Sequence, residues 1–207
     1  LGMFDPQEQV PYASTPMSVV GCAEHVALAY ETAAQSVVLL KNHNHILSLK
    51  PSLNSALVVG PTATSLEALL GNYHGFNLGM TSLLEGIIGR LPEGVRLEYR
   101  PGCTLIHPNR NAMDWSVYEA ANVDVVIACM GLTPHLEGEE GDAILTRDNG
   151  DRSEIELPAV QVEYVKKLAS SGGHIVLVLT GGSPIALGEL ADMVDAVVFV
   201  WYPGQEG

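Results

Sequence analysis

Positive charge is scarce in this chain. Its 207 residues include 10 lysines and arginines against 24 aspartates and glutamates, which gives a formal net charge of -14 at pH 7. Such a surface repels phosphate backbones and anionic membranes, so we expect neither nucleic acid nor a membrane as a partner. Acidity alone does not select a substrate, because a well-solvated surface explains the same charge.

Cysteine and long apolar runs are also scarce. Cys22, Cys103 and Cys129 have no CxxC or Cys/His spacing, so the sequence predicts neither a metal site nor a disulfide framework. Cys129 lies in an apolar run and is expected to be a small core hydrophobe. No apolar run reaches the length of a membrane span, and no signal peptide opens the chain. No cofactor motif is present either, and we expect no cofactor.

The two ends of the sequence are typical of an internal fragment. The chain starts at Leu1 rather than at a methionine, and it stops shortly after the turn residues Pro203 and Gly204. We therefore expect a domain that is truncated at its C-terminal end. The missing signal peptide then leaves the compartment open.

The composition suits one domain preceded by a connector. With 47% hydrophobic residues, the chain is long enough to bury a core over residues 22–207. Residues 1–21 contain Pro6, Pro11 and Pro16 and show no sustained period, which predicts a linker.

Apolar runs alternate with helical patterns along the rest of the chain. Strands are expected near residues 37–40, 56–59, 96–99, 125–130, 175–179 and 196–200, and helices near residues 23–37, 82–91, from 116 onward, 158–168 and 187–193. Ser82 with Glu85 forms a capping box at the start of the second helix. Short apolar runs that do not alternate, separated by helices, indicate a doubly wound α/β domain with a mostly parallel six-stranded sheet and helices on both faces.

A long acidic loop follows the apolar run at residues 125–130. It begins with Glu137 and Glu139 and contains further carboxylates up to Glu156. In an open α/β sheet, ligands bind outside the carboxyl ends of the strands, so this loop lies where chemistry is expected. Crowded carboxylates raise the pKa of at least one of them, which makes a proton donor. The alternatives are a solvated surface loop or a weak calcium site, although the spacing does not match an EF-hand.

A second polar loop follows the strand expected at residues 56–59. Asn72, Tyr73 and His74 are suited to hydrogen bonding and stacking against a sugar, but a turn with a packed Tyr73 explains them equally well. His135, in the acidic loop, is a further candidate ligand contact or a solvated residue. Residues 181–183 (Gly-Gly-Ser) follow a strand, yet they match no phosphate loop and are interpreted as a tight turn.

Several segments are informative when taken together. They are residues 34–42, 58–61, 70–73, 136–139, 150–152, 157–158 and 201–207. In order and spacing they resemble the second, α/β-sandwich domain of glycoside hydrolase family 3, and residues 1–6 resemble the segment that leaves the preceding barrel domain of that family.

The resemblance implies a retaining, exo-acting β-glycosidase. In most members a barrel Asp is the nucleophile and a Glu on a loop of the second domain is the general acid/base. Counting from the strand end places that Glu on Glu137, while an insertion at residues 141–149 leaves Glu139 open and makes Glu140 a weaker third choice. Asp151 and Arg152 are expected to brace the loop as an ion pair.

The resemblance also implies partners and alternatives. We expect a β-linked oligosaccharide or glycoside as substrate, the barrel domain of the same polypeptide as partner, and negligible activity for the chain alone. A β-glucosidase is favoured over a β-xylosidase. A non-catalytic ligand-binding or structural α/β module is the alternative from another class.

Overall fold

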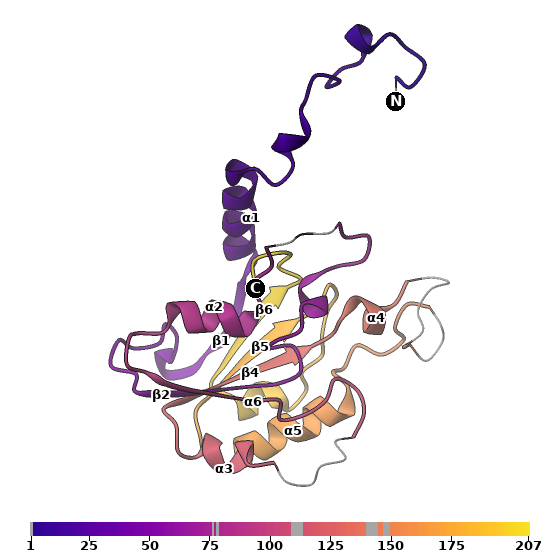
Figure 1. The fold of residues 1–207 in the computed structure, drawn as a ribbon. Coiled ribbons are helices and arrows are strands. Elements are labelled where there is room, and N and C mark those ends of the chain that lie inside the picture. Colours follow the sequence, from indigo (N-terminus) through magenta and orange to yellow (C-terminus); the bar gives the residue numbers. More distant parts are fainter. Residues whose placement is uncertain (1, 76, 78, 109–113, 140–144, 147–149) are drawn as a thin grey trace.

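A computed structural model of the chain describes residues 2–75, 77, 79–108, 114–139, 145–146 and 150–207. The described residues form a sheet of six strands in the order β1-β6-β5-β4-β2-β3 (Figure 1). The strands are β1 (Val38–Asn42), β2 (Ser55–Val59), β3 (Arg96–Arg100), β4 (Val125–Gly131), β5 (Ile175–Thr180) and β6 (Ala196–Trp201). All neighbours are parallel except β1 and β6, which pair antiparallel. The mostly parallel six-stranded sheet is confirmed.

Helices cover both faces of this sheet. In Figure 1, α2 lies over one face, while α3, α5 and α6 lie under the other. The described helices are α1 (Ala23–Ser36), α2 (Leu83–Arg90), α3 (Ser116–Ala120), α4 (Pro134–Glu137), α5 (Ala159–Ser170) and α6 (Leu190–Met193). Single 3-10 turns form at Gln7–Gln9, Met17–Val19, His43–His45 and Glu67–Leu69. The α2 helix begins with the expected capping box, in which Ser82 and Glu85 bond each other's backbone N–H.

The hydrophobic core lies on both faces of the inner strands of the sheet. Every residue of β2 and β4 is buried, which explains why these strands are apolar without alternation. On the α5 face, Tyr164, Val165 and Leu168 pack in one cluster with residues of β4 and β5. On the α2 face, Leu83 packs in a cluster with Cys129. Cys129 is the buried core residue the sequence predicts, and burial raises the pKa of its thiol to about 12.

The N-terminal segment projects away from the sheet (Figure 1). No residue in the range 2–36 is buried. The α1 helix forms where its period predicts it, yet its apolar residues lie in solvent: Val26 is 41% exposed and Leu28 is 60% exposed. Amphipathic spacing thus identified the helix but did not place it against this core. Among the described helices, none is both long and apolar enough to cross a membrane.

The carboxyl ends of the adjacent strands β4, β5 and β6 lie at one edge of the sheet. Gly131 at the end of β4 pairs with Thr180 at the end of β5, and Thr180 pairs with Trp201 at the end of β6. Gly131 has φ 138°, and a Cβ there would lie 2.1 Å from the carbonyl oxygen of Thr180, so only glycine fits. Consequently the loops that follow β4, β5 and β6 all begin side by side.

Candidate active site

The loop after β4 starts from a rigid base. Gln161 of α5 is fully buried, and its side-chain oxygen accepts the N–H of Gly131 at 2.8 Å. Its side-chain nitrogen donates to the carbonyls of Gly131, at 2.8 Å, and Leu105, at 2.9 Å. The N–H of Leu132 donates to the carbonyl of Thr180 at 2.9 Å. The single-turn helix α4 follows, with Pro134 at its first position and Gly138 ending it at φ 78°.

Glu137, at the end of α4, is held by donors from two other loops. The N–H of Gly182 lies 3.0 Å from its Oε1 and 2.9 Å from its Oε2. The Ser183 hydroxyl donates to Oε1, and the Tyr202 hydroxyl donates to Oε2 at 2.6 Å. The side chain is half-buried. Among the described residues, all of its hydrogen-bond partners are donors.

Tyr202 is a permanent donor in this cluster. Burial raises the pKa of its phenol, and the hydrogen bond to the Glu137 carboxylate raises the pKa further. The hydroxyl therefore keeps its proton at neutral pH. The sequence analysis included Tyr202 in a family segment but gave it no role.

Arg152 closes the base of the acidic loop. Its backbone N–H donates to the carbonyl of Glu137 at 2.9 Å. Its guanidinium donates to the Ser183 hydroxyl, from Nη2 at 2.8 Å and from Nε at 3.1 Å, and also to the carbonyl of Pro184. The expected ion pair with Asp151 does not form: among the described residues Arg152 turns toward the loop after β5, whereas Asp151 is exposed.

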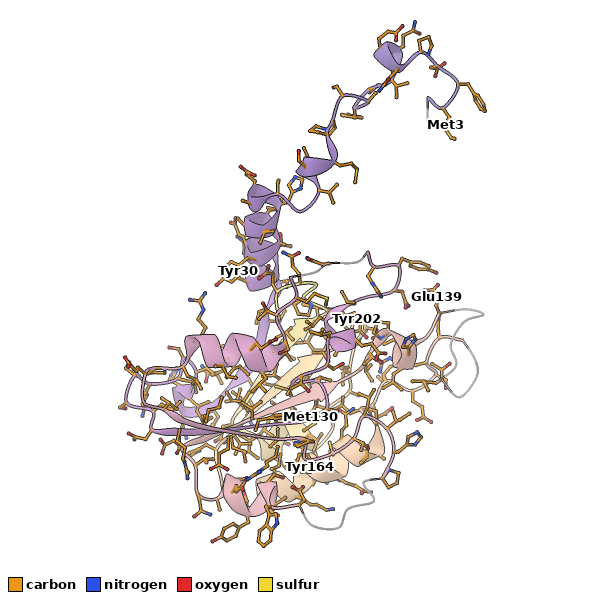
Figure 2. The ribbon with its side chains drawn as sticks, in the orientation of Figure 1. Met3, Tyr30, Met130, Glu139, Tyr164 and Tyr202 are labelled. Carbon is orange, nitrogen blue, oxygen red and sulfur yellow. The ribbon has the colours of Figure 1, made fainter. Side chains whose placement is uncertain are left out.

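Glu139 has the opposite surroundings. It is exposed, and no hydrogen bond or ion pair joins its carboxylate to another described residue. Figure 2 shows it on the loop that leaves α4, farther out than Tyr202. Glu140, the weaker third choice, lies outside the described residues. Asp142 and Asp148 lie outside them too.

The second polar loop lies against α4. The Asn72 side-chain nitrogen donates to the carbonyl of Gly138 at 3.3 Å, and Glu67 forms an ion pair with His135 at 3.5 Å. Tyr73 is 88% exposed and has φ 61°, so it is not the packed turn residue that was the alternative. His74 is exposed and its Nδ1 lies 3.0 Å from the Gly75 carbonyl oxygen. The structure thus brings Asn72 and His135 to the base of the acidic loop.

The loop after β5 has a larger part than the sequence suggested. Residues 181–183 were interpreted as a tight turn, but the turn supplies two of the donors to Glu137. A Cβ at Gly182 would lie 2.8 Å from Oε2 of Glu137 and 3.0 Å from the Tyr202 ring, so a larger residue there would have to displace the Glu137 carboxylate. A cavity of ≈ 330 Å³ opens at this cluster, lined by the cluster residues Glu137, Arg152, Gly182 and Ser183 and by Gly138, Asp151, Ile155 and Pro184.

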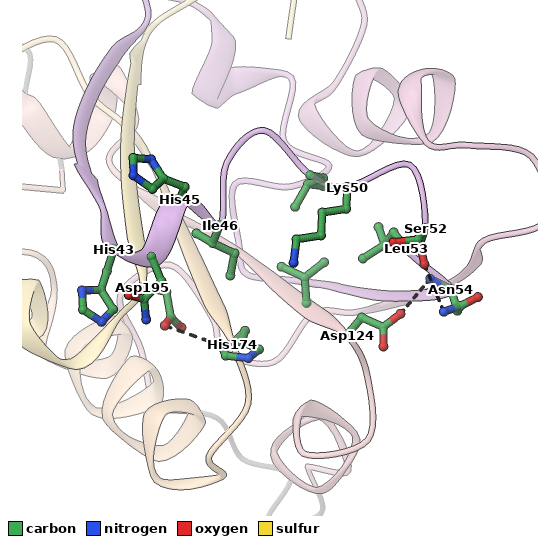
Figure 3. Close-up of a pocket in the computed structure, with 13 residues that line it drawn as sticks. His43, His45, Ile46, Lys50, Ser52, Leu53, Asn54, Asp124, His174 and Asp195 are labelled. Atoms are coloured by element: carbon green, nitrogen blue, oxygen red, sulfur yellow. Dashed lines mark hydrogen bonds and ion pairs between the residues drawn. The ribbon is translucent and has the colours of Figure 1, made fainter.

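A separate cavity of ≈ 400 Å³ lies at the opposite, amino-terminal end of the strands (Figure 3). Its carboxylates are engaged in the fold. Asp124 accepts the N–H groups of Asn54 and Ser55, and Asp195 accepts the N–H of Ile175 and pairs with His174 at 3.5 Å. None of the predicted site residues lines this cavity.

No group of three or more His, Cys, Asp or Glu side chains in the described ranges is arranged to hold a metal ion. The calcium alternative included carboxylates at residues 140–144 and 147–149, which those ranges omit.

Comparison with known proteins agrees with this architecture. Residues 37–207 match the glycosyl hydrolase family 3 C-terminal domain. A β-xylosidase of Formosa agariphila is 29% identical over 99% of this chain and 28% of its own length. Beta-D-xylosidase 1 of Arabidopsis thaliana is 34% identical over 100% of this chain and 26% of its own length.

Solved structures give the same result. A family 3 exo-β-xylosidase in complex with a xylobiose aziridine probe has a TM-score of 0.81 at 29% identity, covering 96% of this chain and 24% of that one. A β-glucosidase from Listeria innocua in complex with glucose has a TM-score of 0.78 at 26% identity, covering 95% of this chain and 26% of that one. The chain thus spans about a quarter of the length of these proteins, and it belongs to glycosyl hydrolase family 3, whose C-terminal domain it carries at residues 37–207.

Proposed function

We propose that this chain supplies the general acid/base and one wall of the substrate pocket of a retaining, exo-acting β-glycosidase. Family membership supports the reaction class. The quarter-length coverage of the relatives supports a further domain of the same polypeptide as partner, a barrel that carries the nucleophile. The observation that best supports the proposal is Glu139, an exposed carboxylate on a loop at the carboxyl edge of the sheet, with no hydrogen bond or ion pair to another described residue.

Retaining hydrolysis needs two carboxyl groups roughly 5 Å apart on either side of the glycosidic bond. One attacks the anomeric carbon, and the other protonates the leaving oxygen and later accepts a proton from water. In the proposal the barrel domain provides the first group and the acidic loop provides the second.

Glu137 and Glu139 are the two candidates for this second group, and the contacts favour Glu139. A general acid/base must exchange a proton with the substrate and then with water. Glu137 already accepts hydrogen bonds from Gly182, Ser183 and Tyr202 on both carboxylate oxygens. Glu139 has no such commitment among the described residues and is open to a ligand. We therefore assign the proton transfer to Glu139, with Glu137 as the alternative.

We propose a terminal β-linked xylosyl residue as the preferred sugar. Support comes from relatives with xylosidase names, among them those of Formosa agariphila and Arabidopsis thaliana, which align over nearly the whole chain. A glucosyl residue is the alternative, which the sequence favoured and which β-glucosidase structures support. Asn72, Tyr73, His74 and His135, on the two loops beside Glu139, are the proposed sugar contacts on this side of the pocket.

The test uses the complete enzyme that carries this domain. In Glu139→Gln, kcat/KM for an aryl β-xyloside with a poor leaving group is expected to fall about 10²- to 10⁴-fold, because general acid catalysis is lost. A dinitrophenyl β-xyloside needs no protonation and should keep most of its kcat/KM. Azide attacks the glycosyl-enzyme without base assistance. It should therefore raise the turnover of the dinitrophenyl β-xyloside by Glu139→Gln and yield β-xylosyl azide.

Glu156→Gln, at an exposed glutamate at the C-terminal end of the same loop, is the matched control and should behave as the unaltered enzyme. If Glu139→Gln turns over the poor-leaving-group xyloside at an unchanged rate, Glu139 is not the general acid/base. A non-catalytic binding module would give this same result. A higher kcat/KM for the aryl β-glucoside than for the β-xyloside overturns the xylosyl preference.

A further inference from the structure

Three loops that are distant in sequence meet at the Glu137 carboxylate. The loop after β4 contributes Glu137 itself, the loop after β5 contributes Gly182 and Ser183, and the chain after β6 contributes Tyr202. Four hydrogen bonds end on the two carboxylate oxygens. Bonds of this kind to an ionised acceptor are stronger than bonds between neutral groups, so the loops are held together by the charge of Glu137.

The same cluster holds both ends of the acidic loop. The loop leaves at Glu137 and returns at Arg152, and the Arg152 N–H donates to the Glu137 carbonyl at 2.9 Å. The Arg152 guanidinium then binds Ser183 and Pro184, next to the donors of the Glu137 carboxylate. Both stems of the loop are thereby attached to the turn after β5. Glu139 lies just beyond the first stem.

The backbone of the turn after β5 lies close to the carboxylate. A Cβ at Gly182 would lie 2.8 Å from Oε2 of Glu137, so a side chain there would displace the carboxylate. Tyr202 keeps its proton, because burial and then the neighbouring carboxylate raise the pKa of its phenol. Each partner donates to the carboxylate, and Ser183 already accepts from Arg152, so a neutral amide, which keeps a single accepting oxygen, would lose at least one of these hydrogen bonds.

We propose that Glu137 is a positioning residue: its carboxylate, bound to Gly182, Ser183 and Tyr202, sets the direction in which the acidic loop presents Glu139 to the glycosidic oxygen. The inference rests on the proposed function of Glu139. Glu137 itself neither gives a proton to the substrate nor takes one from it.

The experiment compares Glu137→Gln and Tyr202→Phe with Glu139→Gln in the complete enzyme. Misplacement of a catalytic group by about 1 Å costs on the order of 10²-fold, so kcat/KM for the poor-leaving-group xyloside should fall by that factor in Glu137→Gln and by roughly 10-fold in Tyr202→Phe. The dinitrophenyl xyloside should be much less affected in both variants. Active-site titration with a mechanism-based inhibitor corrects each rate for the fraction of folded enzyme.

Azide separates positioning from proton transfer. In Glu137→Gln, Glu139 is still present and repels the anion, so azide should neither raise the turnover of the dinitrophenyl xyloside nor form xylosyl azide. In Glu139→Gln, azide should do both. Tyr118→Phe, an exposed tyrosine of α3, is the matched control for the hydroxyl deletion and should leave all rates unchanged. Tyr202→Phe removes a single hydroxyl and carries the test if Glu137→Gln does not fold.

Two results overturn the inference. If Glu137→Gln yields xylosyl azide as an acid/base variant does, Glu137 is itself the proton donor. The second result concerns how kcat/KM per titrated active site depends on the leaving group. If that dependence is unchanged in Glu137→Gln, the cluster is merely structural. If Glu137→Gln does not fold, the same result in Tyr202→Phe leads to the same conclusion. Failure of the proposed function is a different result, because it appears as unchanged kinetics in Glu139→Gln.

Discussion

Two glutamates separated by one glycine have different chemistry in this fold. Glu137 is half-buried and accepts four hydrogen bonds, and Glu139 is exposed without a described partner. Both have the same intrinsic acidity, so their roles follow from what surrounds them. Gly138 between them, at φ 78°, turns the chain so that the second carboxylate leaves the cluster that holds the first.

Gln161 is the residue whose loss should matter most for the base of the site. Gln161→Leu removes the partners of the Gly131 N–H and of the Gly131 and Leu105 carbonyls, and buried backbone groups without partners are costly. We expect the free energy of unfolding, measured in urea, to fall by about 2–4 kcal/mol. Gln35→Leu on the exposed face of α1 is the control and should stay within about 0.5 kcal/mol. A loss below about 1 kcal/mol at Gln161 would contradict this account.

At the scale of the element, the strands are joined at both ends. At the carboxyl ends, the register of β4, β5 and β6 aligns the loops of the candidate site. At the amino ends, Asp124 before β4 accepts the N–H groups of Asn54, at 2.7 Å, and Ser55, at 3.0 Å, before and within β2. The Asp124 N–H returns a bond to the Ser55 hydroxyl at 3.0 Å. Such contacts connect the starts of neighbouring parallel strands.

These contacts make stability depend on pH. The hydrogen bonds from Asn54 and Ser55 lower the pKa of Asp124 below its ordinary value of 3.8. A lowered pKa in the folded state contributes stability above the unfolded pKa of about 3.9 and loses it as the pH falls through the folded value. Asp124→Asn should therefore lower Tm at pH 7, and the difference from the unaltered protein should shrink below about pH 4.

Thermal unfolding at a series of pH values measures the difference. Asp192→Asn, on the exposed side of α6, is the matched control and should leave the difference near zero throughout. A Tm difference for Asp124→Asn that stays constant from pH 7 to pH 3 would refute the role of Asp124.

At the scale of the whole molecule, the proposed function gives the chain one of the two carboxyl groups that the reaction needs. Its candidate acid/base lies at the carboxyl edge of the sheet, and the mechanism needs a second carboxyl group roughly 5 Å away to attack the sugar. Within the described residues the nearby Glu137 is bound to three donor residues and is not available for attack. In the proposed function, the nucleophile belongs to the barrel domain.

The isolated chain should accordingly show no turnover of an aryl β-xyloside above the background rate. Activity should return when the chain is assayed as part of the complete enzyme, with active-site titration to count competent sites. Circular dichroism of the isolated chain serves as the control for folding. Robust hydrolysis by the isolated chain would refute the division of the two carboxyl groups between domains.

The local pattern was sufficient for most of the secondary structure. Apolar runs placed β2, β4, β5 and β6, and the Ser82–Glu85 pair placed the start of α2, because each signal depends on neighbours within a few residues. The doubly wound, mostly parallel sheet followed from strands that were apolar on both faces. Its position after an interior strand and then the family resemblance both indicated the acidic loop as the candidate site.

Contacts between distant residues were beyond such patterns. Glu137 and Tyr202 are 65 positions apart, and Glu137 and Gly182 are 45 apart, so no local spacing could have joined them. For the same reason the sequence paired Arg152 with its neighbour Asp151, while the fold pairs it with Ser183. The antiparallel direction of β1 and the solvent exposure of α1 also depend on which elements pack beside them. The period of a sequence does not identify those elements.

The amino-acid order alone therefore established which segments are strands and helices, because burial in a layered sheet imposes a repeating local pattern. With the family resemblance, it also narrowed the proposed acid/base to a few neighbouring glutamates. What distinguishes these glutamates was decided by the folded chain, because hydrogen-bond donors from the ends of two other strands converge on Glu137, whereas no described residue bonds the carboxylate of Glu139.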